Sequence, residues 1–477
     1  MLPEISISPE YMTSLAHKLL DDPAAQVGEW GLEKLTGGLE LGSTIYRLSG
    51  TAKAGGVDLG GRRIIKTILP DPTKDDPDGC HYWKREPLAY QSGLIYGLSG
   101  QVTAPRCLDV LENPDGSIWM CLEDVEDATA RPWSLELYAR ASRQLGEFNG
   151  AYLAGRALPD DAWITHDWLR KYLQEAAPSI DYILQNPADP IINRMLPGIT
   201  LPLTLALWDE HERMLQVLDA MPQVFCHQDA FDRNLFYRGE ELVVIDWNYS
   251  GIAPVGTETA ALVGAALGVS GFPASQARQL DQACLENYIE GLRQAGYQPD
   301  PRQVRLCFCL TLELRYVTGG MIGEMIPRLL DPATRQSVLD SFQQTEETAG
   351  QSDPEIVNYY IGMLTETLKT LGLGATLRVV ARTVFHAVRL LGKRRTRDAS
   401  PGAQAAGCER IPVEWTTGAR CPTALRRRWS RSRQRRHPRP SGHHRDIPNS
   451  PVCWSTSGQH GSRRTRAHRG FRRAEGR

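Results

Sequence analysis

The segment 227–246 restricts the fold of this 477-residue chain more than any other part of it. It begins with His-Gln-Asp-Ala-Phe-Asp-Arg-Asn and continues into two apolar runs, at 234–237 and 241–245. The Arg-Gly-Glu at 238–240 between these runs is typical of a tight turn. We therefore predict a β-hairpin whose returning strand ends in an acid.

A hairpin brings its two ends together, so Asp229, Asn234 and Asp246 are predicted to converge at one edge of the sheet. Carboxylate and amide oxygens are hard ligands that hold magnesium. Phosphoryl transfer needs such ligands, because it depends mostly on positioning and on neutralising phosphate charge. A second interpretation stays open, in which Asp229 and Asp232 are turn residues and Asp246 caps the next segment.

The pattern His-x-Asp-x-x-x-x-Asn, followed by an apolar strand and Asp-Trp, closely resembles the aminoglycoside phosphotransferase and choline kinase-like family. This family has the protein kinase-like fold. The resemblance implies that Asp229 orients or deprotonates an acceptor hydroxyl. It also implies that Asn234 and Asp246 bind Mg²⁺. His227 would brace the loop by hydrogen bonding.

Two features that follow the hairpin also bear on the resemblance. Gly251–Pro254 resembles the small-residue loop that comes after the metal-binding acid in this family. Glu258 departs from the family pattern, since many members carry Asp there. That residue usually supports the loop and takes no part in the chemistry, so the difference puts little in doubt.

A kinase-like chain should carry a nucleotide-binding lobe upstream. Strands are expected at 33–36 and 43–49, around a glycine-rich loop. Glycine lets a backbone approach phosphates closely, and exposed amides in such a loop attract anions. Four loop residues are therefore assigned to the nucleotide: Gly37, Gly38, Gly42 and Ser43. Because the loop matches neither Gly-x-Gly-x-x-Gly nor the P-loop pattern, an ordinary glycine-rich hairpin is the alternative.

A strand is expected at 62–69, after a glycine-rich turn at 55–61, and Lys66 is its one lysine, among the apolar residues that follow two arginines. Glu86 then opens a helix. In a kinase, Lys66 would contact the nucleotide's phosphates and Glu86 would hold Lys66 in place. Each residue also has an ordinary interpretation. A lysine can snorkel to solvent, and an acid just before Pro87 is favoured by the helix dipole.

Strands expected at 105–110 and 117–122, around a strong Asn-Pro-Asp-Gly turn signal, follow that helix. The resemblance places the hinge between two lobes at this point. The Leu122 carbonyl and the Asp124 amide are then the expected contacts of the adenine base. Backbone contacts leave no side-chain signature, so this assignment comes from the resemblance alone.

The chain beyond the hinge is predicted to be largely helical. Ser134 precedes an amphipathic helix, and a proline-rich break is expected at 187–197. Further helical patterns lie at 168–183, 203–218 and 275–294. The expected fold class is α+β. A small antiparallel-sheet nucleotide lobe spans 1–122, and a larger, mainly helical catalytic and acceptor-binding lobe spans 123–392.

Several polar and aromatic residues of the helical lobe could line the acceptor site. They are the run 163–168, Glu313, Arg315, Tyr316 and Glu324. Each can equally be a residue of a solvated face or of the core, and the sequence does not decide between these alternatives.

The charge of the chain is divided unequally. Residues 393–477 hold 22 Lys and Arg against 5 Asp and Glu, a net charge of +17, whereas residues 1–392 carry a net charge of −19. The acidic body argues against a nucleic-acid partner for the folded part and would favour the approach of a cationic acceptor.

The Arg-rich tail at 393–477 shows no apolar periodicity and is predicted to be disordered. It either binds RNA or an acidic partner, or it is the translation of a shifted reading frame. Just before it, a helical face over 377–391 either packs on its own domain or lies on an anionic membrane.

We expect a small-molecule kinase that uses Mg²⁺ and transfers the terminal phosphoryl group of ATP or GTP to a hydroxyl. Its partners are then the nucleotide and a small hydroxylated substrate. The sequence leaves open whether that acceptor is an aminoglycoside, a macrolide, choline, a sugar or another metabolite. The alternative is a nucleotide-binding regulator without catalysis, although a binding module has no need for a proton-accepting acid such as Asp229.

Ten cysteines are scattered along the chain without paired metal-ligand spacing, as is typical of reduced structural thiols. The amino terminus has no charged segment followed by an apolar run, and no stretch reaches about eighteen apolar residues. A cytoplasmic location without membrane insertion is therefore expected.

Overall fold

The computed structural model describes residues 5, 7–35, 43–186, 188–197, 200–342, 344–351 and 353–372. Contacts divide the chain into the units Met1–Ser400 and Pro401–Arg477, and every described residue lies in the first unit. The tail at 393–477, the helix expected at 377–391 and the loop glycines Gly37, Gly38 and Gly42 lie outside the described residues. The predictions for them stay predictions.

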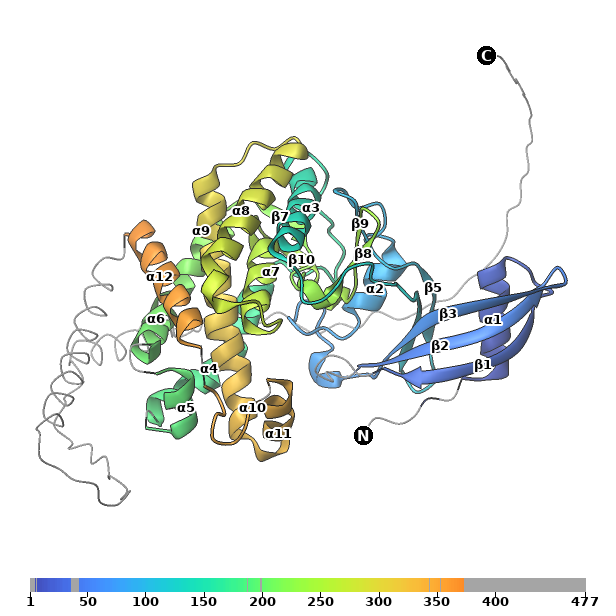
Figure 1. The fold of residues 1–477 in the computed structure, drawn as a ribbon, viewed down its shortest axis with the longest axis horizontal. Helices are drawn as coiled ribbons and strands as arrows, with labels where there is room; N and C mark the ends of the chain where they lie inside the picture. Colours follow the sequence, from blue (N-terminus) through green and yellow to red (C-terminus); the bar gives the residue numbers. More distant parts are fainter. Residues whose placement is uncertain are drawn as a thin grey trace, which may run out of the picture. The chain divides into compact units, whose positions relative to one another are not determined.

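The amino-terminal part of the described chain is a five-stranded sheet in the order β1-β2-β3-β6-β5 (Figure 1). All four strand pairs are antiparallel, which confirms the expected small antiparallel sheet. The strands are β1 (Gln26–Lys34), β2 (Ser43–Ala54), β3 (Val57–Ile68), β5 (Cys107–Glu112) and β6 (Ile118–Glu123). The lobe boundary predicted after residue 122 falls one residue before β6 ends.

The hairpin of β2 and β3 is longer than the sequence suggested. The expected glycine-rich turn at 55–61 is wrong in extent, because residues 57–61 pair with β2 as the start of β3. Only Gly55 and Gly56 form the turn, and both have positive φ, at 59° and 82°. A side chain is disfavoured in that conformation, whereas glycine adopts it readily.

One helix packs on the sheet and was not expected from the sequence. This helix, α1 (Pro9–Leu20), begins where the Ser8 hydroxyl accepts a hydrogen bond from the Tyr11 amide. Its buried face contacts apolar side chains of the central strands. The buried cluster between them consists of Ile7, Met12, Leu15, Tyr46, Leu48, Ile65 and Cys121. This cluster gives the sheet its own core.

The rest of the described chain is mainly helical, as expected (Figure 1). Its α-helices are α2 (Arg85–Ser92), α3 (Leu135–Leu153), α4 (Trp168–Gln185), α5 (Pro190–Met195), α6 (Thr200–Asp219), α7 (Thr257–Gly268), α8 (Ala277–Gln294), α9 (Pro301–Leu312), α10 (Ile326–Leu330), α11 (Pro332–Ser341) and α12 (Pro354–Thr370). A π-helix, η5 (Glu313–Met325), joins α9 to α10. The 3-10 turns are η1 (Pro72–Lys74), η2 (Asp232–Asn234), η3 (Trp247–Tyr249) and η4 (Ala274–Gln276).

The expected break at 187–197 is only partly correct, because it contains helix α5. Asp189 accepts hydrogen bonds from the amides of Ile191 and Ile192, and Pro190 occupies the first helical turn. A capping acid followed by proline starts a helix, so this proline begins an element where it was expected to interrupt one.

Two small sheets carry the segment that opened the sequence analysis. The hairpin is β8 (Leu235–Arg238) and β9 (Glu241–Val244), which confirms the expected pair of strands, and the short β4 (Val102–Thr103) runs parallel to β9. Strand β7 (Gln223–Cys226) pairs with β10 (Gly251–Pro254). The loop that carries His227 and Asp229 is therefore held between two sheets.

Helices α3 and α8 cross closely behind that loop. Gly146 and Gly291 make the approach possible, since a Cβ at either position would collide with a carbonyl of the other helix. From this crossing, the Asn149 amide nitrogen donates to the Phe225 carbonyl at 2.9 Å, and the Tyr288 hydroxyl donates to the Asn149 side-chain oxygen at 2.6 Å. The helix pair thus fixes strand β7, which leads into the loop.

The stretch Pro301–Leu330, which spans α9, η5 and α10, is long and apolar enough to cross a membrane by length and composition. In the protein, 67% of its most apolar window is buried. It also packs against α7, α4 and α6. The apolar side chains of this stretch are therefore accounted for by packing in the core.

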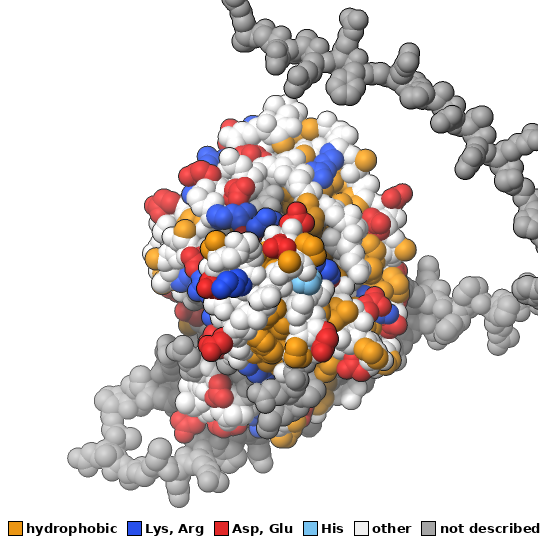
Figure 2. Space-filling view, turned by 90° about the vertical axis from the view of Figure 1, so that its right-hand side faces the viewer, with side chains coloured by type: hydrophobic (Ala, Val, Ile, Leu, Met, Phe, Trp, Pro, Cys, Tyr) orange, Lys and Arg blue, Asp and Glu red, His pale blue; other side chains and the backbone are white. Residues whose placement is uncertain are grey.

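The face in Figure 2 shows Lys and Arg side chains interspersed with Asp and Glu. Nucleic-acid binding normally needs a continuous basic patch or stripe. This face does not offer one.

Substitution of Gly291 by alanine should lower the free energy of unfolding. A Cβ there meets the backbone carbonyl of Arg143, which cannot move without separating α3 from α8. Overpacking of this kind costs about 1–3 kcal/mol. Urea unfolding would measure the change.

Gly268→Ala is the matched control, since Gly268 is also a helical residue, the last of α7, but has no atom within 4 Å of its added Cβ. This variant should be neutral or more stable by up to about 1 kcal/mol, the gain in helix propensity. Equal stability of the two variants would contradict the proposed close packing.

Candidate active site

Lys66 of β3 forms an ion pair with two carboxylates that lie far from it in the sequence. Its ammonium nitrogen is 2.5 Å from Glu86 Oε2 and 2.8 Å from Asp246 Oδ1. Burial would lower the pKa of Lys66, but the two acids raise it above its ordinary value. The lysine is therefore charged at neutral pH. The structure brings together the pair expected from the sequence and adds Asp246 to it.

The strand register places Ser43 near this lysine. Lys66 pairs with Ile45, and Ser43, the first residue of β2, pairs with Ile68. Strand β1 also ends at this side, because the Leu35 amide donates to the Ile45 carbonyl. The ends of the two strands that flank residues 36–42 thus lie beside Lys66.

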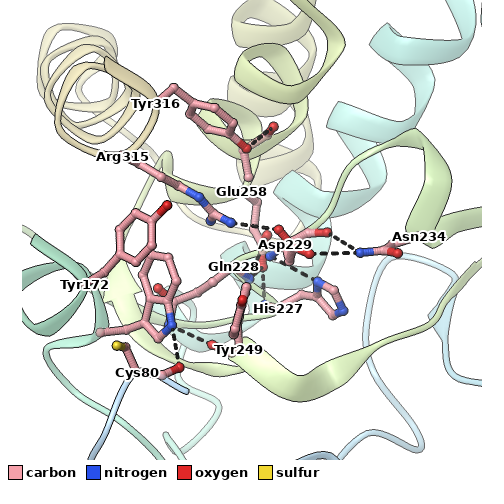
Figure 3. A network of polar contacts seen from close by, with 12 residues as sticks. Cys80, Tyr172, His227, Gln228, Asp229, Asn234, Tyr249, Glu258, Arg315 and Tyr316 are labelled. Carbon is pink, nitrogen blue, oxygen red and sulfur yellow. Dashed lines mark hydrogen bonds and ion pairs between the residues drawn. The ribbon is translucent and has the colours of Figure 1, made fainter. Parts of the chain in front are cut away.

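Asp229 lies in the loop after β7, between an amide and a guanidinium (Figure 3). Its Oδ2 accepts a hydrogen bond of 3.0 Å from Asn234 Nδ2, and its Oδ1 accepts one of 2.7 Å from Arg315 Nη2. Burial raises the pKa of Asp229 to about 6, although Arg315 opposes that rise. At neutral pH the Asp229 carboxylate is therefore mostly ionised. Its pKa is close enough to neutral pH for it to take up a proton.

Asn234 and Asp246 offer oxygen atoms that suit a hard cation. The Asn234 amide nitrogen donates to both the backbone and the side chain of Asp229, so its oxygen is the end left for a ligand. Asp246 gives Oδ1 to Lys66, which leaves Oδ2, and its side chain is 44% exposed. Carboxylate and amide oxygens fit Mg²⁺.

The backbone at Asp246 is left-handed, with φ at 63°. Such a conformation costs energy for a side-chain-bearing residue and concentrates at functional sites. The alternative of a helix cap is not supported, because the Asp246 side chain makes no capping hydrogen bond to the turn η3 that follows. Its carboxylate turns to Lys66 instead.

His227 connects the loop to the hairpin. Its Nε2 lies 2.9 Å from the Ile245 carbonyl, and its Nδ1 accepts a hydrogen bond from the Asp229 amide at 3.2 Å. Burial lowers the pKa of His227 to about 4, so the ring is neutral. A neutral ring with the proton on Nε2 satisfies both contacts.

Glu258 of α7 supports the loop that carries His227 and Asp229. This fully buried carboxylate accepts hydrogen bonds from the backbone amides of His227 and Gln228, and Gln228 has a left-handed backbone at a φ of 66°. Burial raises the pKa of Glu258 to about 7, and the two amides oppose the rise. The acid at this position supports the loop through the two backbone amides.

Arg315 lies on the π-helix η5 and points at Asp229 (Figure 3). The guanidinium also lies 4.7 Å from the ring centre of Trp168, which stacks on Tyr172. The Tyr172 hydroxyl donates to Glu324 at 2.6 Å. Gly319 permits this packing, because a Cβ there would collide with the Tyr172 ring.

Three of the acceptor candidates therefore gather beside Asp229, namely Trp168, Arg315 and Glu324. Two others do not reach it through a polar contact. Glu313 accepts a hydrogen bond from the Thr367 hydroxyl in the core, and the Tyr316 hydroxyl donates to the Ala261 carbonyl. The sequence named Arg315 only as one of several residues that could line the acceptor site, and it did not predict the ion pair with Asp229.

At the expected hinge, Leu122 belongs to β6 and Asp124 follows the strand. The Asp124 carboxylate accepts a hydrogen bond of 3.0 Å from Arg47 Nε and lies 3.5 Å from Arg62 Nε. These contacts order the chain where the sheet ends. The two backbone contacts to adenine stay predictions.

Comparison with known proteins supports the resemblance. Residues 88–299 match the model of a family described as the phosphotransferase enzyme family, and this match confirms the resemblance found at residues 227–246. No match was found among curated proteins.

Solved structures with a similar fold include an aminoglycoside phosphotransferase from Alicyclobacillus acidocaldarius (15% identity, 77% of this chain and 98% of that chain, TM-score 0.47). A choline kinase from Cryptosporidium parvum is 12% identical over 79% of this chain and 99% of that one, with a TM-score of 0.47. A spectinomycin phosphotransferase in complex with ADP and spectinomycin is 14% identical over 76% and 99%, with a TM-score of 0.42. The antiparallel sheet and the mainly helical remainder of the described chain agree with the α+β fold expected from the sequence.

Substitution of Glu258 by alanine should lower the free energy of unfolding by about 2–3 kcal/mol, since two buried amides would lose their acceptor. Glu258→Gln keeps one acceptor oxygen and should lose less. Urea unfolding monitored by tryptophan fluorescence would compare them. The control Glu286→Ala, on the exposed side of α8, should change stability by no more than about 0.5 kcal/mol. A Glu258→Ala protein as stable as this control would contradict the supporting role.

Proposed function

We propose that this protein is a small-molecule kinase that transfers the terminal phosphoryl group of ATP or GTP to a hydroxyl group. The observation that carries the proposal is the meeting of four parts of the sequence in one site. Lys66 and Glu86 come from the first lobe, and Asp246 bonds to Lys66 from the end of the hairpin. Asp229 and Asn234 lie at the start of the same hairpin.

In the proposed reaction the acceptor oxygen forms a bond to the terminal phosphorus as the bond to the leaving diphosphate oxygen breaks. Asp229 takes the proton of the acceptor hydroxyl, and its pKa of about 6 suits that task at neutral pH. Arg315 and Asn234 hold one carboxylate oxygen each. They fix the orientation of the acid.

Lys66 would neutralise charge on the nucleotide's phosphates, and Glu86 keeps its ammonium in place. Asn234 and Asp246 would hold Mg²⁺, which when bound supplies positive charge beside the phosphates. His227 and Glu258 keep the loop in the shape that this arrangement needs.

The remaining nucleotide contacts belong to the same proposal. Gly37, Gly38, Gly42 and Ser43 would approach the phosphates. The Leu122 carbonyl and the Asp124 amide would bind adenine at the boundary between the lobes at 1–122 and 123–392. The support is the position of Ser43 beside Lys66 and the end of β6 at the hinge.

The acceptor is proposed to be a small hydroxylated compound of the kind that similar kinases use, such as an aminoglycoside or an amino alcohol like choline. The net charge of −19 on residues 1–392 favours a cationic one. A cytoplasmic location would give the enzyme both its nucleotide and a reducing environment for its thiols.

Substitution of Asp229 by asparagine should lower kcat by about 10²–10⁴-fold and leave nucleotide affinity unchanged, because only the proton acceptor is lost. Steady-state turnover across a panel of hydroxylated and amino-sugar acceptors, with nucleotide binding measured in parallel, would check this. The control Asp232→Asn alters an acid of the same loop that bonds to Arg131 and Ser270, and it should keep most of the turnover. Full activity of the Asp229 variant would contradict its role. Absence of turnover in the wild-type protein, despite tight nucleotide binding, would favour a regulator.

Substitution of Asp246 by alanine should weaken binding of the magnesium nucleotide. Loss of even a supporting contact in a metal site costs about 10–100-fold in affinity, so loss of a ligand should cost at least about tenfold. Titration with a fluorescent nucleotide, with and without Mg²⁺, would separate the metal-dependent part. The control Asp109→Ala removes an acid that pairs with Lys18 on the surface of the first lobe. An Asp246 variant that binds the magnesium nucleotide as tightly as this control would overturn the assignment.

A further inference from the structure

A second group of potential metal ligands lies on the loop between β3 and α2. Cys80 and His81 of this loop and Glu175 of α4 each place one donor atom within 4.8 Å of the others. The Cys80 thiol donates to Glu175 Oε1 at 3.0 Å, and His81 Nε2 lies 3.2 Å from Glu175 Oε2. The three side chains come from two elements and point to one place.

The backbone beneath these side chains is fixed. Arg85 is fully buried and donates five hydrogen bonds to backbone carbonyls. The acceptors are Pro77, Gly79, Cys80, Trp163 and Asn248. Such a buried guanidinium holds the loop in one conformation, which is what a preorganised ligand site needs.

The helical lobe holds the loop from the other side. The Trp168 indole donates to the Cys80 carbonyl at 3.0 Å, and Lys171 donates to the Asp78 carbonyl at 2.6 Å. Both donors lie on α4, the helix that carries Glu175. The separation of the three ligands is therefore set by contacts other than their own.

The chemistry of the donors selects among metals. A thiolate, an imidazole and a carboxylate are together the ligands of zinc, whereas magnesium and calcium prefer oxygen alone. Cys80 is 3% exposed, but the side chains of His81 and Glu175 are 21% and 55% exposed, so an ion can reach the group from solvent. We propose that Cys80, His81 and Glu175 bind a zinc-class divalent cation, with a fourth position open to water.

The bound ion would fasten two parts of the protein. Cys80 and His81 precede α2, which carries Glu86, and Glu175 belongs to the helical lobe. The centre of the His81 ring lies 5.6 Å from that of Tyr249 and 6.2 Å from that of Tyr172. Figure 3 shows Cys80 on the side of the candidate active site where Tyr172 lies. The ion would thus connect the end of this loop to helix α4, whose Trp168 lies against Arg315. It is separate from the oxygen ligands Asn234 and Asp246.

Metal binding by the full-length protein tests this proposal without reference to phosphoryl transfer. The protein is stripped with a chelator and titrated with Zn²⁺ against a chromogenic competitor, and with Co²⁺ to record thiolate-to-cobalt absorption. The wild type should bind one more ion than Cys80→Ser and should gain thermal stability on binding. Since a lost supporting contact costs about 10–100-fold, Glu175→Gln should weaken that site by at least about tenfold.

Cys107→Ser is the matched control. Cys107 is a partly exposed thiol of the first lobe that hydrogen-bonds to the Asp109 carbonyl, and it contributes to no metal-ligand group among the described residues. This variant should keep the ion and the cobalt absorption. Equal zinc stoichiometry and equal cobalt absorption in the wild type, Cys80→Ser and Glu175→Gln would overturn the proposal. The contacts of Glu175 with Cys80 and His81 would then only anchor the loop. A Cys80→Ser protein that fails to fold leaves Glu175→Gln to decide the outcome.

Discussion

The ion pair of Lys66 with Glu86 and Asp246 is the interaction on which the arrangement of the two lobes most depends. Lys66 lies in the sheet, Glu86 in the helix beside it and Asp246 at the end of the hairpin. A charge buried in this way must keep its partners, because removing one of them typically costs about 3–5 kcal/mol. Lys66, the helix and Asp246 are therefore positioned relative to one another by the protein alone, before any nucleotide binds.

Helix α2, which carries Glu86 of this ion pair, is short and depends on its tertiary contacts. It has eight residues and no side-chain cap at its amino end, and a helix that short is marginal in isolation. Its first two residues, Arg85 and Glu86, are both buried charges and leave the helix in different directions. Glu86 meets Lys66, and Arg85 meets the loop before the helix and the Asn248 carbonyl. Those two side chains hold the helix in place, and burial that lowers the pKa of Arg85 to about 10 still leaves it charged at neutral pH.

Much of the fold and part of the site could be predicted from the sequence because the information there is local. The hairpin from Leu235 to Val244 follows from two apolar runs and a turn, and Lys66 was recognisable as a charge in an apolar strand. The contacts that were missed join residues far apart. Arg315 and Asp229 are separated by 86 positions, and Cys80 and Glu175 by 95, so no local spacing links them. Helix α1 and the short helix α5 were missed for another reason, since each begins at a capping side chain followed by proline, a signal that also occurs in turns.

The π-helix η5 decides which side chains its segment presents to the site. Arg315 and Glu324 are nine positions apart, which is two and a half turns of an α-helix with about 3.6 residues per turn, so in an α-helix they would face opposite ways. The wider winding of a π-helix brings the same nine positions close to two full turns. Both residues therefore lie over α4, one above Trp168 and the other on Tyr172. A helical wheel drawn with the ordinary period would place Arg315 and Glu324 on opposite faces, and the wider winding of this one segment turns both of them toward the same helix.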